Sequence, residues 1–441
     1  MVWVVALTAI PALAAAHVSE RALVMLLPTT IYIRAGAAAV ALTVMFTIFV
    51  RPAWVRGAFR AVSRAPRSRD VAPLITSLAS TAFLMVLLWQ GVWGTRDPLG
   101  NPLPLVIWSV WWILLPPAQA LIGDIWSWIN PWRGVLRLLP GAGLHLPDGW
   151  GHWPAFLGFV LFAAFMTADP APADPTRLAI IIGLYWSAML AGAVVFGEAW
   201  LARGEGLTVA FSLFSRLAPL SKSTFGAPGH RIVDGPPLSP SVAALLIALL
   251  ATSSFDGLNG TFTWLALIGI NPLEFPGKSA VIRSNLLGLA GAIATLAGLL
   301  ALAIWAGLRL ARARVPFGAA FCALIPSIIP IAIGYHIAHY LTIFLVGAQY
   351  AALAVRRAAG AADFFVTTGF FNSPDSVQRI WLIQAGAIVI AHMLAVGLAH
   401  AVALRLLGSH RQAVISQLPM AVFMIGYTVF GLWILAQPTG A

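Results

Sequence analysis

The segment "SNLLGLAGAIATLAGLLALAIWAGL", residues 284–308, has no charged side chain in 25 consecutive positions. A helix of about 20 apolar residues crosses the hydrocarbon core of a bilayer, so this segment is long enough to span a membrane. Similar runs recur along the whole chain, in which 60% of the 441 residues are hydrophobic and 9% are charged. Globular domains carry about 25% charged residues. The sequence therefore predicts an all-α, polytopic transmembrane helical bundle.

The apolar runs predict about ten spans within a single transmembrane domain that covers residues 17–441. We expect the spans at 31–50, 72–94, 104–124, 153–171, 178–201, 241–265, 284–310, 317–350, 378–406 and 412–436.

Basic residues set the expected orientation of the bundle. The formal net charge is +12, and Lys and Arg are enriched in cytoplasmic loops. The loop 51–70 holds six Arg and one Asp, so we expect it in the cytoplasm with the loops near 127–152 and 204–240, and the N-terminus outside. Arg356 and Arg357 then fall outside. Either their loop breaks the rule, or the number of spans near 317–350 is miscounted.

The N-terminus carries features of a secretory signal. Residues 1–13 are apolar, and the A-x-A pattern that follows predicts a signal peptide over residues 1–16. No Lys or Arg precedes the apolar stretch, so an uncleaved N-terminal segment remains the alternative. Cleavage would make His17 the first residue, with an amine and an imidazole that can both bind copper.

Two histidines stand one helical turn apart in "GYHIAHY", residues 334–340. His336 and His339 share one helix face, and neutral imidazole is the commonest protein ligand of Zn and Cu. His392 or Asp256 could supply a third ligand, which gives an intramembrane site for a divalent metal, Zn or Cu. The alternative is that the histidines hydrogen-bond between helices, together with Tyr335 and Tyr340.

Other ionisable residues lie within or at the ends of predicted spans, where such residues mark functional sites by default. Asp256 is a candidate ligand, general base or proton carrier, with helix capping as the alternative. Glu198 is a candidate proton-path residue or an interfacial partner of a basic side chain. Asp124 closes a third span, and His400 lies toward the cytoplasmic end of another.

Two segments are predicted at the membrane interface. Residues 206–222, "GLTVAFSLFSRLAPLSK", are expected as an amphipathic helix along the cytoplasmic surface. Residues 123–133, "GDIWSWINPWR", hold three Trp that suit the headgroup region and an Asn-Pro turn signal.

Six stretches together match one family pattern in order and spacing. They are residues 16–36, 97–112, 123–133, 252–264, 333–345 and 417–433. They resemble a family of bacterial polytopic membrane proteins commonly labelled fenitrothion hydrolase, and the resemblance covers nearly the whole chain.

The resemblance implies hydrolysis of an organophosphorus ester by an enzyme embedded in the bacterial inner membrane. A metal held by His and Asp would supply the activated water and the electrophile that such a reaction, or that of another lipophilic ester, needs. Asp256, His336 and His339 match the family pattern. The family has an Asp after the histidine that corresponds to His400, whereas Ala401 stands there in this chain, which puts a His–Asp pair at this position in doubt.

Three function classes follow: a metal-dependent membrane hydrolase, a transporter or metal-handling permease that uses the same polar residues, and a non-catalytic membrane subunit. The sequence has no ATP-binding motif, no haem-attachment motif and no dinucleotide fingerprint. The single Cys322 excludes a disulfide framework within the chain. The expected partners are the lipid bilayer and a small lipophilic substrate, without nucleic acid, and the oligomeric state is left open.

Overall fold

The computed structural model describes residues 24, 27–63, 71–221, 223–274, 277–358 and 360–439. The predicted signal peptide and His17 lie outside this part of the chain. Within it, nine helices are long and apolar enough to cross a membrane, so the protein is a polytopic helical bundle. They are α2 (Thr29–Phe49), α4 (Val71–Trp93), Pro102–Ile122, α10 (Pro175–Phe196), α14 (Pro240–Asn259), Lys278–Leu310, Phe317–Ala358, α19 (Pro374–Leu407) and α20 (His410–Leu435).

Each of these nine helices corresponds to one predicted span. The tenth prediction, 153–171, is the shorter apolar helix α9 (Trp153–Ala168). The run that begins at Phe317 forms one long helical segment, and the side of the membrane on which Arg356 and Arg357 lie stays a prediction. This segment consists of α17 (Phe317–Leu324), the 3-10 turn η5 (Ile325–Ile328) and α18 (Ile329–Ala358).

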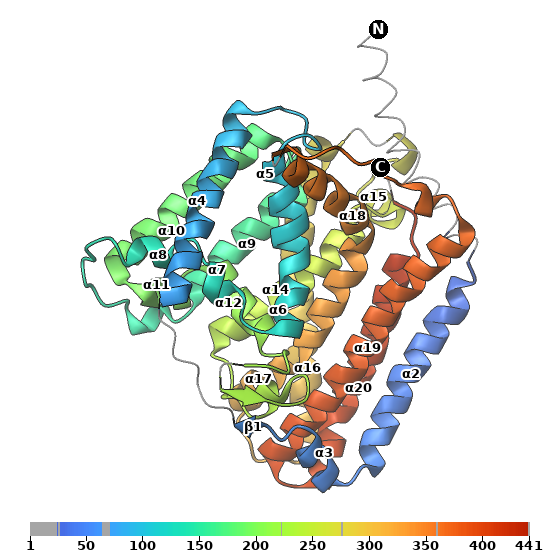
Figure 1. Cartoon of the computed structure of the whole chain (residues 1–441). Coiled ribbons are helices and arrows are strands. Elements are labelled where there is room, and N and C mark those ends of the chain that lie inside the picture. The colour runs from blue at the N-terminus through green and yellow to red at the C-terminus, as the bar shows by residue number, and fades with distance from the viewer. Residues whose placement is uncertain are drawn as a thin grey trace.

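The bundle is built around α14 and α18, whose apolar windows are the most deeply buried of the long helices. α18 packs against α19 and α14, α19 packs against α20, and α20 packs against α2 and α16 (Ile282–Leu310). In Figure 1, α2 from the start of the chain therefore lies beside the C-terminal helices, while α4 and α10 cover the opposite side. The chain ends at the rim of the bundle near α15.

Short elements mark the two ends of the bundle in Figure 1. One end, called the α3 end, holds α3 (Pro52–Ala58) and the two-residue strand β1 (Val62–Ser63), which pairs antiparallel with β2 (Thr224–Phe225). The opposite end, called the α15 end, holds α5 (Pro102–Pro104) and α15 (Phe262–Leu267). The remaining 3-10 turns are η2 (Asp148–Trp150), η3 (Pro272–Glu274), η4 (Lys278–Val281) and η6 (Gly369–Phe371).

The helix Pro102–Ile122 changes its winding along its length. It runs from α5 through the π-helix η1 (Leu105–Leu114) into α6 (Leu115–Ile122). α6 begins with Pro116 and Pro117, which have no backbone N–H to donate. An α-helical N–H donates to the carbonyl four residues earlier, so Pro117 cannot reach the carbonyl of Ile113. That oxygen is available to another helix.

The interfacial prediction for residues 206–222 is wrong for its first ten residues. They form α12 (Gly206–Ser215), which is buried at every position except Ser212. The polar side chains of α12 are small hydroxyls rather than charges, so no face of the helix needs water. This part of the expected 204–240 loop is thus a core helix.

The tryptophan segment packs onto α12 instead of standing at the surface. Trp126 at the start of the short helix α7 (Trp126–Ile129), and Asn130 between α7 and α8 (Arg133–Leu136), both donate to Thr208 Oγ1, at 2.8 and 3.1 Å. Trp126 and Trp132 are buried, because indole N–H groups that find internal acceptors can be buried. Of the three, Trp128 is exposed, so a place in the headgroup region stays a prediction for Trp128 alone.

Candidate functional site

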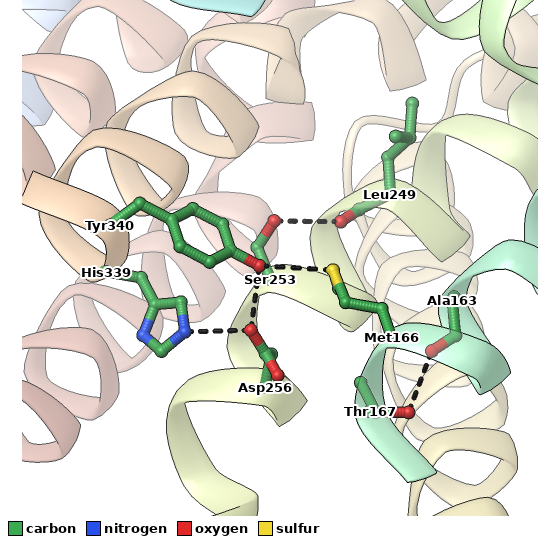
Figure 2. A network of polar contacts seen from close by, with 8 residues as sticks. All are labelled: Ala163, Met166, Thr167, Leu249, Ser253, Asp256, His339 and Tyr340. Atoms are coloured by element: carbon green, nitrogen blue, oxygen red, sulfur yellow. Dashed lines mark hydrogen bonds and ion pairs between the residues drawn. The ribbon is translucent and has the colours of Figure 1, made fainter. Parts of the chain in front are cut away.

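A buried carboxylate meets an imidazole and a phenol near the α15 end of the bundle. Asp256 lies one turn before the end of α14, and His339 and Tyr340 lie side by side on α18. Figure 2 shows both side chains converging on one carboxylate oxygen. His339 Nε2 is 2.8 Å and Tyr340 Oη is 2.7 Å from Asp256 Oδ2. The sequence named all three residues, and the structure brings them together.

The hydrogen bonds define the roles of the atoms. An ionised carboxylate only accepts hydrogen bonds, so both Tyr340 Oη and His339 Nε2 donate to Asp256. His339 Nδ1 then carries the lone pair. A Cβ added at Gly257 would lie 3.5 Å from this nitrogen, so the missing side chain at Gly257 leaves space directly beside it. The arrangement provides a base held in one tautomer by a carboxylate.

The base lies beside a cavity of about 210 Å³ between α14, α18, α19 and α20. The side chains of Asp256 and His339 remain 16% and 25% exposed, so small molecules can reach them. The apolar part of the wall is formed by Ala338, Ile388, Ile434 and Leu435. The cavity therefore offers a mostly apolar space with one acid–base group.

His336 does not share this site. Its Nε2 donates over 3.2 Å to the carbonyl of Ile113, the oxygen that Pro117 cannot reach. The ring also packs against Trp112 and Tyr340. His336 is 2% exposed, and its contacts fulfil the alternative expectation of a hydrogen bond between helices.

Replacing His336 with Leu should lower the stability of the protein. The carbonyl of Ile113 would lose its side-chain donor in a buried place, which costs about 1–3 kcal/mol. Chemical unfolding in mixed micelles measures that cost. A variant as stable as the wild type would contradict this assignment.

Two further polar residues join α18 to its neighbours. Tyr335 Oη donates to the carbonyl of Tyr427 over 2.6 Å, and Gln384, which was not among the predicted residues, donates through Nε2 to the carbonyl of Ala338 over 2.7 Å. The predicted ligand His392 instead donates through Nδ1 to the carbonyl of Ile388 in its own helix, 2.9 Å away. His392 does not line the cavity.

His400, Asp124 and Glu198 lie away from the candidate site. His400 is buried, with its ring 5.7 Å from that of His410 at the start of α20. Asp124 follows α6, and its Oδ1 accepts from the N–H of Ser127. Glu198 begins α11 (Glu198–Arg203) and is exposed. Asp124 and Glu198 line a second cavity, which is considered below.

The described residues contain no group of three or more His, Cys, Asp or Glu side chains that could hold a metal ion. Two donors, Asp256 and His339, meet at the cavity, whereas a zinc site uses roughly three or four protein ligands. His17 lies outside the described residues. The Zn or Cu site stays a prediction.

Sequence reasoning missed a buried acid in α12. Glu205 is completely buried at the N-cap of this helix, where its carboxylate accepts from the N–H groups of Leu207 and Thr208 and from the Tyr185 hydroxyl. The sequence does contain a signal for an N-cap at this position. One acidic residue stands between two glycines, "GEG", directly before an apolar run. The donors satisfy both carboxylate oxygens, which favours a structural role.

Comparison of the chain with protein-family models, curated proteins and solved structures finds no match. The shape of the cavity and the chemistry of its residues therefore carry the functional argument.

Proposed function

We propose that this membrane protein hydrolyses a small lipophilic ester at the Asp256–His339–Tyr340 cluster. The observation that carries the proposal is the free Nδ1 of His339, which lies beside a cavity while Nε2 is held by a buried carboxylate. A paired carboxylate and imidazole form the base arrangement that activates nucleophiles in many hydrolases. The proposed substrate class includes the organophosphorus esters implied by the family resemblance.

The proposed reaction uses water as the nucleophile. His339 Nδ1 takes a proton from water as the water oxygen attacks the carbonyl carbon or phosphorus of the ester. The imidazolium then donates that proton to the departing alkoxide or phenolate, which restores neutral His339. Asp256 remains ionised throughout and stabilises the imidazolium, while Tyr340 holds the carboxylate in place.

The cavity supports a small, weakly polar substrate. Its volume of about 210 Å³ limits the substrate to a small molecule. Its apolar wall matches alkyl or aryl substituents. Ser253 and Ser254 also line it, but their hydroxyls donate to the carbonyls of Leu249 and Leu250 in the preceding turn. This favours water over serine as the nucleophile.

The test is hydrolysis of 4-nitrophenyl acetate and of a dialkyl 4-nitrophenyl phosphate by the protein in lipid nanodiscs. Gly257→Val should reduce the rate about 100-fold, because its methyl groups would occupy the space beside His339 Nδ1 and displace the water. Gly291→Val is the matched control, since a Cβ at Gly291 in α16 meets no other atom within 4 Å. Equal rates for the two variants, or no hydrolysis of either ester by the wild type, would overturn the proposal.

A second candidate, proton-coupled transport, is favoured by a row of buried polar groups. Ser254 Oγ lies 2.6 Å from the Tyr427 hydroxyl, and the rings of Tyr427 and His392 are 6.2 Å apart. His400 follows two turns along α19, toward His410. The row extends from beside Asp256 toward the α3 end, and buried ionisable groups of this kind form proton relays in membrane proteins.

Proteoliposomes that contain a pH-sensitive dye separate the two candidates. Proton uptake that disappears in His392→Leu would favour transport, since His392 does not line the cavity. Ester hydrolysis that persists in the same variant would favour the hydrolase.

A further inference from the structure

A second cavity opens at the other end of the molecule and is lined by basic side chains. It has a volume of about 1280 Å³ and lies between α6, α7, α8, the start of α4 and the segment 216–236. Arg133, Arg137, Arg216 and Arg231 line it. Residue 61, next to β1, and residue 224, in β2, also line it. The cavity therefore lies at the α3 end. None of its lining residues lines the cavity at Asp256.

This second cavity is called the cleft. Several of its guanidinium N–H donors have no acceptor among the described residues. Nε and Nη2 of Arg231 are buried without a hydrogen-bond partner, and so is Nε of Arg133. Arg133 Nη1 donates to the carbonyl of Ser127 over 3.1 Å, which fixes the direction of its side chain. Buried donors without acceptors are costly, so a ligand with several acceptor oxygens would stabilise them.

The acidic residues of the cleft offset this charge only in part. Asp234 Oδ1 lies 3.5 Å from Nη1 of Arg405, a residue that does not line the cleft. Glu198 is exposed. Burial lowers the pKa of the Arg231 guanidinium, and the positive charge of Arg216 lowers it further. The Asp124 carboxylate acts in the opposite direction and raises it. An anion placed between Arg216 and Arg231 would relieve the repulsion between them.

The donor geometry favours phosphate among anions. Each guanidinium presents a planar set of N–H groups that matches two oxygens of a phosphate, and arginines from three separate segments surround the cleft. Leu74, Ile122 and the exposed Trp128 add apolar lining to the cleft, a combination of apolar and basic groups that suits a lipid with an anionic headgroup. Basic pockets between transmembrane helices bind anionic headgroups in other membrane proteins.

We propose that the cleft of Arg133, Arg216 and Arg231 binds a phosphate group. The group comes either from an anionic phospholipid of the surrounding leaflet or from a soluble phosphate. This site is independent of the hydrolysis proposed at Asp256.

The experiment compares both sources on the detergent-purified full chain. Native mass spectrometry counts bound phosphatidylglycerol against phosphatidylcholine, and a thermal shift assay compares inorganic phosphate with chloride at equal ionic strength. Arg216→Gln/Arg231→Gln should weaken binding roughly tenfold or more for each arginine removed. Arg314→Gln is the control, because Arg314 is exposed and does not line the cleft.

Preferential retention of phosphatidylglycerol that is lost only in the double variant supports a lipid headgroup as the source. A shift with inorganic phosphate that is lost in the same way, without lipid preference, supports a soluble source. Binding that the double variant and Arg314→Gln reduce equally overturns the proposal. A wild type that binds neither probe overturns it as well, whether or not the double variant folds.

Discussion

Asp256→Asn should lower the rate of ester hydrolysis by about 10⁴-fold, the loss seen when the carboxylate of a catalytic Asp–His pair becomes an amide. Tyr340 Oη and His339 Nε2 both donate to Asp256 Oδ2, so the carbonyl oxygen of an Asn side chain can take the place of Oδ2 and accept from both. The amide is neutral, however, and no longer supplies the negative charge that stabilises the imidazolium of His339.

Without the carboxylate charge, His339 Nδ1 is a weaker base toward water. If the amide nitrogen takes the Oδ2 position instead, it donates to His339 Nε2 and moves the imidazole proton to Nδ1, beside Gly257, where it blocks proton transfer from water. The rate should fall through loss of turnover, while substrate binding in the cavity stays close to that of the wild type. A fall in binding alone would point to a binding residue instead.

Initial rates with 4-nitrophenyl acetate over a range of concentrations measure this effect. Asp363→Asn is the matched control, because Asp363 forms an exposed ion pair with Arg357 outside the cavity. If Asp256→Asn hydrolyses the ester as fast as Asp363→Asn does, then Asp256 is not part of the base and the proposed mechanism fails.

Glu205→Ala should destabilise the bundle by about 3–5 kcal/mol, because three buried donors lose their acceptor and each such loss costs about 1–3 kcal/mol. The substitution removes the acceptor of the Tyr185 hydroxyl and of the Leu207 and Thr208 N–H groups at the start of α12. All these groups lie inside the protein, where water cannot replace the carboxylate.

The unfolding free energy in micelles titrated with SDS measures this loss. Glu205→Gln should be milder, because the amide keeps one acceptor oxygen for these donors. Glu198→Ala, a few residues earlier on the exposed surface of α11, should stay near the wild type. Equal stability of Glu205→Ala and Glu198→Ala would contradict the role assigned to Glu205.

The spans could be predicted from the sequence because length and apolarity are local properties of the chain. Residues 284–308 indicate a membrane helix without reference to any other part of the protein. The position of α12 could not be predicted in this way. An apolar run of ten residues fits the membrane surface and the protein core equally well, and the groove that accepts α12 is built by segments far away in the sequence.

The candidate site was only partly predictable for a related reason. His336 and His339 look equivalent in the sequence, at neighbouring positions on one helix. The structure separates them through their partners, because Asp256 is 83 positions away from His339 and Ile113 is 223 positions away from His336. The role of Pro117 in freeing the carbonyl of Ile113 becomes visible only when the two helices lie side by side.

The hydrogen bonds of α18 have a consequence for motion. His336, Tyr335 and the carbonyl of Ala338 tie this helix to η1, α20 and α19, respectively, each through a bond that involves a backbone carbonyl. A backbone carbonyl, unlike a side chain, cannot change rotamer to follow a moving neighbour. Sliding of α18 past its neighbours would break all three bonds, so these contacts resist displacement of His339. A widening of the cavity for a larger ligand is therefore expected to come from residues 436–439 after α20, of which Thr439 lines the cavity, rather than from rocking of the central helices.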